Sequence, residues 1–130
     1  MTMPATPCPG PCGRPQLKRI YDAPSTADGQ RVLVDRLWPR GIARDAAAID
    51  LWLPQVAPSP ALRRWFAHDP DRWAQFRARY QAELALPNAQ LTTLCGLLDS
   101  ATITLLYGAR DRLHNHAVVL ADVLQAMRRA

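Results

Sequence analysis

The sequence predicts an α/β domain in which a small, mostly parallel sheet is flanked by helices in a three-layer arrangement. Two short runs, 31–38 and 101–108, are rich in β-branched and aliphatic residues and have the continuous hydrophobicity of strands covered on both faces. The segments between and after them place apolar residues at helical spacing. The second run, with its loop and helix, is half of a βαβ unit, so the two runs are expected to pair in parallel. At 130 residues the chain has the length of one domain.

Turn-forming residues mark where the strands begin and end. An extended segment is expected at 18–21, and the Asp-Gly turn at 28–29 separates it from the first hydrophobic run. Pro39 helps to end that run. The stretch 49–58 is ambiguous, because a strand there would be interrupted by Pro54, and proline favours an edge position.

Capping residues predict where three of the helices begin. Ser59 and Asp69 each precede a proline, which suits the first position of a helix, and Asn88 is placed to cap a third helix. A fourth helix is expected near the C-terminus. The apolar residues that define the helix faces are Trp73, Phe76, Tyr80 and Leu84 in the second helix, Leu91, Leu94 and Leu98 in the third, and Val119, Leu120, Val123, Leu124 and Met127 in the last.

Composition and charge limit the classes of protein that this chain can belong to. Hydrophobic residues make up 48% and charged residues 21%, an ordinary globular balance that excludes disorder for the chain as a whole. No apolar run is long enough to span a membrane, so no membrane association is expected. The net charge is +5, but Arg14, Lys18 and Arg19 place basic charge near the N-terminus. Basicity by itself is therefore weak evidence for nucleic-acid binding.

Residues 1–16 are expected to form a disordered, proline-rich leader ahead of a single domain at 17–130. Five of the first fifteen residues are proline and no apolar core is present, so the segment does not resemble a signal peptide, and a cytoplasmic protein is expected. Cys8 and Cys12 lie in this leader. Zinc would need four ligands, and no Cys or His pair nearby completes a site. Cys95 is expected to pack as a small hydrophobic residue.

Several standard catalytic motifs are absent from the sequence. It contains no phosphate-binding Walker loop, no G-x-G-x-x-G and no nucleophile elbow. Glu83 is the one glutamate and lies four residues after Arg79, where a surface ion pair is expected. A glycosidase with paired carboxylates is therefore poorly supported. No motif identifies a cofactor, decides whether the protein is an enzyme, or fixes an oligomeric state.

Polar segments follow both predicted strands, at 35–41 and at 107–111. The carboxyl ends of parallel strands meet at one edge of the sheet, where ligands bind in open α/β folds. Arginine there can form paired hydrogen bonds with a phosphate or carboxylate, and histidine can exchange protons near neutral pH. The candidate catalytic residues are Asp35, Asp111 and His116, and the candidate ligand-binding residues are Arg36, Trp38, Arg40, Gly41, Ser59, Arg110 and Asn115, with no metal ligand among them.

Each of these residues also has a structural interpretation. Asp35 and Arg36 could instead form internal ion pairs across the loops with Arg110 and Asp111. Asp111 is also placed to cap the last helix. His114 lies two residues before His116, so on a helix the two histidines could not share a metal ion, and a third ligand is missing nearby.

Five stretches of the chain together resemble the YeaO-like family of bacterial proteins, over about residues 18–126. They are KRIYD, DGQRVLVDRLWPRG, WLPQVAPS, LRRWFAHDPDRWAQFRARYQAEL and TLLYGARDRLHNHAVVLADVL. The resemblance implies a small α/β domain with a parallel sheet and no assigned reaction. A broader related group carries Cys-His-Arg where this chain has residues 115–117, so the thiol is absent here. The family's hallmark positions fall on Asp35, Arg36, Trp38, Pro39, Arg40, Gly41, Pro58, Ser59, Arg110, Asp111 and Asn115.

The leading functional hypothesis is binding or conversion of an anionic small molecule at the carboxyl edge of the sheet. The alternative is a nucleic-acid-associated module, whose binding would depend steeply on salt. A third hypothesis is a protein-interaction domain whose leader orders on binding. The nucleic-acid-associated module of the alternative hypothesis would bind through its arginine-rich helices. Its arginines are Arg63, Arg64, Arg72, Arg77 and Arg79.

Overall fold

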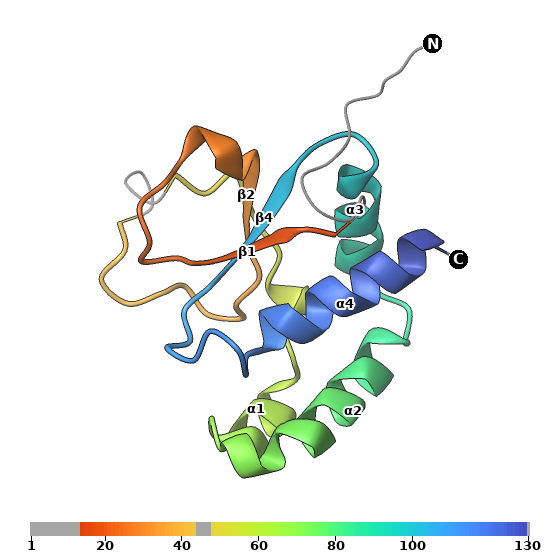
Figure 1. Ribbon diagram of the computed structural model, residues 1–130. Helices are drawn as coiled ribbons and strands as arrows, with labels where there is room; N and C mark the ends of the chain where they lie inside the picture. Colours follow the sequence, from red (N-terminus) through yellow and green to blue (C-terminus); the bar gives the residue numbers. More distant parts are fainter. Residues whose placement is uncertain (1–13, 44–47, 130) are drawn as a thin grey trace.

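A computed structural model describes residues 14–43 and 48–129, with side chains to residue 127 (Figure 1). The expectations for Cys8, Cys12 and most of the leader lie outside these residues. The elements in chain order are β1 (Gln16–Arg19), η1 (Thr26–Asp28), β2 (Gln30–Leu33), β3 (Leu51–Trp52), η3 (Pro54–Val56), α1 (Pro60–Phe66), η4 (Pro70–Arg72), α2 (Trp73–Leu84), α3 (Ala89–Leu98), β4 (Ile103–Tyr107) and α4 (His116–Arg129).

The four strands form one parallel sheet in the order β1-β4-β2-β3. The predicted pairing of the two hydrophobic runs is confirmed, since β2 lies beside β4 in parallel with Val32 opposite Leu105. β3 has only two residues and lies at the edge of the sheet, in agreement with Pro54 following it closely. The fold is therefore mixed α/β with a small parallel sheet and four α-helices, as predicted.

The two faces of the sheet are covered in different ways. One face belongs to the main hydrophobic cluster, which also contains buried apolar residues from each of the four α-helices. On the other face, Leu33 and Leu106 pack with Ile20 in a smaller cluster. Among the described residues, that cluster is completed from loops and strand ends, so the outer layer on this side is not a layer of α-helices. Its partly buried members are Trp38, Ile42, Ile49 and Trp52.

Most predicted helix caps are confirmed. The Ser59 hydroxyl accepts a hydrogen bond from Leu62 N–H, and the Asn88 side chain accepts from Leu91 N–H. Asp69 caps the short η4 turn that leads into α2.

Two local predictions are wrong. Asp111 does not cap the last helix, because α4 begins later, at His116, and Asn115 accepts from Val118 N–H instead. Glu83 does not pair with Arg79; its carboxylate faces inward and accepts hydrogen bonds from the Ser59 N–H and hydroxyl, at 2.9 and 2.6 Å.

The boundary of the expected leader also shifts. Gln16 begins β1, and the Arg14 guanidinium forms an ion pair of 2.5 Å with Asp122 on α4. Residues 14–16 are therefore part of the folded domain, because both the sheet and a helix hold them.

Candidate functional site

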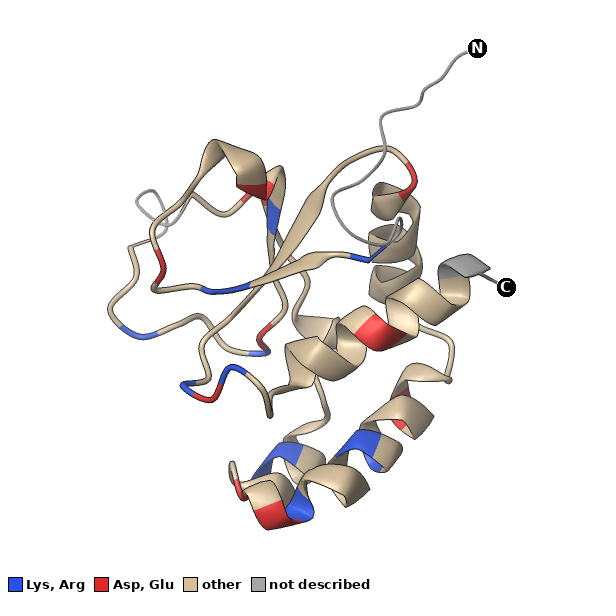
Figure 2. Cartoon of the chain, in the orientation of Figure 1, with Lys and Arg blue, Asp and Glu red and all other residues tan. Residues whose placement is uncertain are grey.

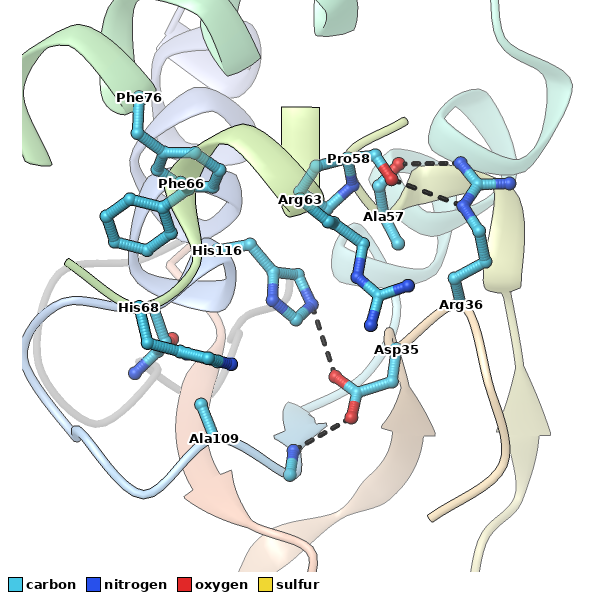
Figure 3. Close-up of a pocket in the computed structure, with 12 residues that line it drawn as sticks. Asp35, Arg36, Ala57, Pro58, Arg63, Phe66, His68, Phe76, Ala109 and His116 are labelled. Carbon is cyan, nitrogen blue, oxygen red and sulfur yellow. Dashed lines mark hydrogen bonds and ion pairs between the residues drawn. The ribbon is translucent and has the colours of Figure 1, made fainter. Parts of the chain in front are cut away.

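A cavity of about 250 Å³ lies at the carboxyl edge of the sheet. The segment after β2 supplies Asp35 and Arg36, and the segment after β4 supplies Gly108 and Ala109. The first residues of α4 and the α1–α2 region close the remaining sides (Figure 3). The parallel pairing of β2 and β4 brings the first two segments together, as the sequence predicted.

Asp35 occupies the floor of the cavity, two residues after the buried end of β2. Its Oδ2 accepts a hydrogen bond of 2.9 Å from the Gly108 N–H, which joins the ends of β2 and β4. Its Oδ1 is buried and has no hydrogen-bond partner among the described residues. Burial raises the pKa of Asp35, and the nearby charge of His116 and the Gly108 hydrogen bond only partly offset this effect.

His116 is the first residue of α4 and faces Asp35 across the cavity. Its Nε2 donates to the Val34 carbonyl at 3.0 Å and lies 3.3 Å from Asp35 Oδ1. Since the ring N–H points to the carbonyl, the Asp35 contact is electrostatic and not a hydrogen bond. Burial lowers the pKa of His116, while the charge of Asp35 and the hydrogen bond to Val34 raise it by less. Burial thus disfavours the charged imidazolium, and the Val34 carbonyl, which can only accept, places a hydrogen on Nε2.

Arg36 lines the cavity, but its guanidinium is already engaged. It donates to the Pro58 carbonyl at 3.2 Å and to the Ala57 carbonyl at 3.1 Å. These bonds hold the segment before α1 against the end of β2 (Figure 3). Arg36 therefore shapes one wall of the cavity, and its Nε and Nη2 donate to the backbone.

Two cationic or titratable cavity residues were not among the predicted site residues. Arg63 on α1 and His68 just after it both line the cavity. Ala67 and His68 have positive φ angles of 48° and 57°, and this left-handed turn directs the chain back over the site. From the sequence, Arg63 was considered only as one of the arginines of the nucleic-acid alternative. The local sequence does not indicate which face of α1 meets the carboxyl edge of the sheet.

Aromatic rings form the wall opposite the polar floor. Phe66 and Phe76 both line the cavity and stack with their ring centres 4.2 Å apart. His68 lies beside Phe66, with 6.3 Å between ring centres. The helical stripe containing Phe76 was predicted as core, and the structure confirms its burial while placing one edge of it at the cavity.

The other candidates after β4 divide between the cavity and the surrounding loop. Asn115 is buried, lines the cavity and donates to the Asp111 carbonyl at 2.8 Å. Asp111 lies outside the cavity lining, and its carboxylate accepts from the N–H groups of Leu113 and His114, which lower its pKa. Arg110 is exposed and also lies outside the lining.

The remaining predicted site residues lie away from the cavity lining. Trp38 packs edge-to-face with Trp52 on the other face of the sheet, with ring centres 5.5 Å apart. Arg40 and Gly41 are exposed in the loop after β2, where the Arg40 carbonyl accepts from Tyr21. Ser59 serves as the cap of α1 and binds Glu83.

The ion-pair lattice considered for Asp35, Arg36, Arg110 and Asp111 is not present among the described residues. Arg36 binds carbonyl groups, and Asp111 binds backbone N–H groups of its own loop. Asp35 instead binds the Gly108 N–H, so these four side chains do not pair with one another.

The arginines of the nucleic-acid alternative differ in their surroundings. Arg77 forms an ion pair of 2.8 Å with Asp122, and Arg72 pairs with Asp69 at 3.7 Å. Arg79 lies over the Trp65 ring, with its guanidinium carbon 4.2 Å from the ring centre. Figure 2 shows acidic residues between the basic ones on this part of the fold.

Two features are absent from the described part of the chain. No group of three or more Cys, His, Asp or Glu side chains there is placed to hold a metal ion. No helix there is long and apolar enough to cross a membrane.

These features define a small α/β domain with a parallel sheet and a mixed-charge cavity at its carboxyl edge. A family model described as the inactive DUF488-N3 subclade matches residues 14–130, and the chain belongs to this family.

Curated bacterial relatives agree with this assignment. The uncharacterised protein YeaO of Escherichia coli (strain K12) is 43% identical, over 86% of this chain and 97% of that protein. The uncharacterised protein Rv3073c of Mycobacterium tuberculosis (strain ATCC 25618 / H37Rv) is 41% identical, over 85% of this chain and 93% of that protein. The resemblance to the YeaO-like family is thus confirmed. No solved structure matches the chain.

Proposed function

We propose that this protein binds a small anionic ligand in the cavity at the carboxyl edge of the sheet. The observation that carries the proposal is the Arg63 guanidinium. It lines the cavity, and no described residue forms a hydrogen bond or ion pair with it. A guanidinium has five N–H donors arranged to bind a carboxylate or phosphate in pairs, so an unengaged one at a cavity is a natural anion site.

The other walls support a ligand of limited size. The cavity, at about 250 Å³, is slightly below the usual range for drug-sized ligands, which suits a small metabolite. Phe66 and Phe76 offer an apolar surface, and the His68 ring also lines the cavity. A short apolar body with an anionic group fits this combination.

Binding is better supported than turnover. The cysteine that a broader related group carries at position 115 is an asparagine here, and this Asn115 is buried as the cap of α4. The family is described as an inactive subclade. The pair of Asp35 and His116 is held by Gly108 and Val34 in a fixed arrangement, which suits recognition of a ligand.

The alternative of nucleic-acid binding has less support, because Arg72 and Arg77 have acidic partners within the fold. A gel-shift assay with DNA and RNA at low salt tests it, because binding through phosphate contacts would appear there and weaken steeply as salt is added.

A thermal-shift screen with inorganic phosphate, sugar phosphates, nucleotides and small carboxylates tests the proposal. At least one anion is expected to raise the melting temperature of the wild-type protein. Arg63→Ala should abolish that shift, because the side chain supplies the free donors. Arg64→Ala is the matched control, since both arginines are exposed on α1 but only Arg63 lines the cavity.

Two outcomes would contradict the proposal. One is the absence of any shift across the whole panel, and the other is a shift that Arg63→Ala leaves unchanged. Arg40→Ala is expected to leave binding intact, because Arg40 lies outside the cavity lining.

A further inference from the structure

A largely buried pair of titratable side chains lies in the same cavity as Arg63. Asp35 follows β2 and His116 begins α4, and their side chains are 21% and 15% exposed. His116 Nε2 lies 3.3 Å from Asp35 Oδ1, as the dashed line in Figure 3 shows. Since both residues line the cavity, the charge of an anion bound there would act on the pair.

His116 has one nitrogen at which it can gain a proton. The hydrogen on Nε2 is directed to the Val34 carbonyl at 3.0 Å, so a further proton would bind at Nδ1. Nδ1 has no hydrogen-bond partner among the described residues. A protonated His116 would form an ion pair with Asp35, whose Oδ1 likewise lacks a hydrogen-bond partner within the described chain. The fold thus holds the two members of an ion pair in contact.

Two positively charged groups oppose the proton on His116. Burial lowers the pKa of His116, while the charge of Asp35 and the Val34 carbonyl raise it by less. The positive charge of Arg63 on α1, and that of His68 just after α1, lower the pKa of His116 further. Both of these groups line the cavity, so an anion bound there would offset the charge that disfavours the imidazolium.

Other groups near His116 keep one charge state in neutral and mildly acidic solution. Tyr80 on α2 lies edge-on to the His116 ring, with 6.3 Å between ring centres. Burial holds the pKa of Tyr80 well above its ordinary value, so its hydroxyl stays neutral. Arg36, on the cavity wall, stays charged, as arginine does in proteins. A change of charge at His116 therefore depends on the anion and on the groups that face it in the cavity.

We propose that anion binding in this cavity is coupled to the uptake of a proton by His116, so that the site binds anions more tightly in mild acid than at neutral pH. The inference rests on the proposed function, because it describes how that same site is regulated. The proton comes from solvent and adds to Nδ1, which converts the neutral imidazole into an imidazolium paired with Asp35. Because linkage is reciprocal, an anion that favours the proton is favoured by it to the same extent.

Asp35 makes proton uptake possible at a buried site. A lone imidazolium would be costly there, and the carboxylate compensates for that cost. The carboxylate is also fixed in place, because Oδ2 accepts from the Gly108 N–H at 2.9 Å and a Cβ at Gly108 would lie only 2.9 Å from the same oxygen. Removing the charge of Asp35 should therefore remove the coupling.

NMR titration of the three histidines of the chain tests the proposal in the wild-type protein. The ring protons are followed across pH without ligand and at saturating sulfate, which gains no proton in the range used. Acetate replaces sulfate if sulfate does not bind, and the anion of the panel that stabilises the protein most replaces both if neither does. The anion is expected to raise the pKa of His116 by about half a unit or more. His114 is the internal control, since it lies outside the cavity lining and its titration should not change.

Isothermal titration calorimetry with the same probe measures the consequence for binding. The anion is expected to bind about threefold more tightly at about pH 5.5 than at about pH 7.5. His116→Gln should remove this dependence, because its amide can donate to the Val34 carbonyl but gains no proton. Asp35→Asn should also remove it. His68→Gln is the matched control, since it deletes the other imidazole of the cavity lining and should leave the dependence in place.

The outcomes separate this inference from the proposed function. If the anion binds, Arg63→Ala weakens it and the titration of His116 does not move, the coupling is wrong and the anion site stands. The same conclusion follows if His68→Gln removes the pH dependence and His116→Gln retains it. If no anion of the panel binds the wild-type protein, the proposed function fails and the inference fails with it. Circular dichroism establishes that each variant is folded, and the wild-type titration decides the question for any variant that is not.

Discussion

Charged side chains are arranged differently at the two ends of β2 and β4. At the amino edge of β2 and β4, Asp28, Lys18 and Arg31 form a closed network. At the carboxyl edge, Asp35 and Arg63 face one cavity and do not pair. Both carboxylates are largely removed from solvent, so the difference lies in the partners that the fold supplies.

The amino-edge network satisfies its carboxylate from several directions. Asp28 accepts from Lys18 Nζ at 3.1 Å, from Arg31 Nη1 at 2.5 Å and from the Ser25 N–H at 3.0 Å. Its carbonyl accepts from the Thr104 hydroxyl at 2.7 Å. Burial alone would raise the pKa of Asp28, but these hydrogen bonds outweigh it and the pKa is lowered.

The pKa values of the two carboxylates therefore shift in opposite directions. A lowered pKa means that the fold stabilises the charged form, as at Asp28. A raised pKa means that the fold disfavours it, as at Asp35, where burial is the main cause.

Breaking the amino-edge network is expected to have the largest effect on stability. Asp28→Ala removes the carboxylate that both Lys18 and Arg31 bind, and the Arg31 side chain is only 5% exposed. Removing one partner of a buried ion pair costs about 3–5 kcal/mol, so the free energy of unfolding should fall by about that amount. Urea denaturation monitored by circular dichroism measures the change.

Asp71→Ala is the control for this variant, because Asp71 is exposed and lies outside the network. Its effect should stay within about 0.5 kcal/mol. A loss at Asp28→Ala no larger than that of the control would show that the closed network does not stabilise the fold.

Asp35→Asn should have a smaller effect of the opposite sign. Because the folded-state pKa of Asp35 is raised, the ionised side chain destabilises the fold at pH values above that pKa, and the neutral amide removes this penalty. The free energy of unfolding at pH 7 should be unchanged or higher, by at most about 1 kcal/mol. Urea denaturation at pH 7 gives the comparison, and a clear loss would mean that Asp35 is a structural charge like Asp28.

The same variant has an expected effect on a neighbour. The charge of Asp35 raises the pKa of His116, so its removal should lower that pKa below its wild-type value. Titration of the His116 ring protons by NMR reports the direction, and a rise would contradict the electrostatic contact at 3.3 Å.

The smallest effect is expected at an exposed ion pair near the carboxyl edge. Arg112 donates to both oxygens of Asp22, at 2.8 and 2.9 Å, and holds the pKa of Asp22 at about 2. Because this folded-state pKa is below the ordinary value of 3.8, the contribution is complete above about pH 4 and is lost as the pH falls through about 2.

Asp22→Asn should therefore cause a slight loss of stability at pH 7, because solvent screens exposed pairs, and the difference from wild type should shrink between pH 4 and pH 2. Thermal unfolding followed across that pH range gives the measurement. A difference that does not change with pH would mean that the charge of Asp22 contributes nothing.

The sequence predicted those parts of the fold that depend on residues close together along the chain. Continuous hydrophobic runs identified β2 and β4, and a strand, loop and helix in succession implied their parallel pairing. The caps Ser59 and Asn88 were predictable because a cap bonds to N–H groups two or three residues away. The parallel pairing in turn brought Asp35, Arg36, Asn115 and His116 to one cavity.

The remaining site residues depend on contacts between distant parts of the chain. Which side of α1 meets the sheet edge decides that Arg63 lines the cavity and Arg64 does not, and this depends on how α1 packs against α2 and the core. Tertiary packing also decides that Glu83 binds Ser59 and not Arg79. It likewise decides that Trp38 and Arg40 lie outside the cavity lining. Local sequence determined where the strands and helices form, whereas tertiary packing decided which charges were paired and which were left facing a cavity, because pairing depends on distances in space that spacing along the chain does not fix.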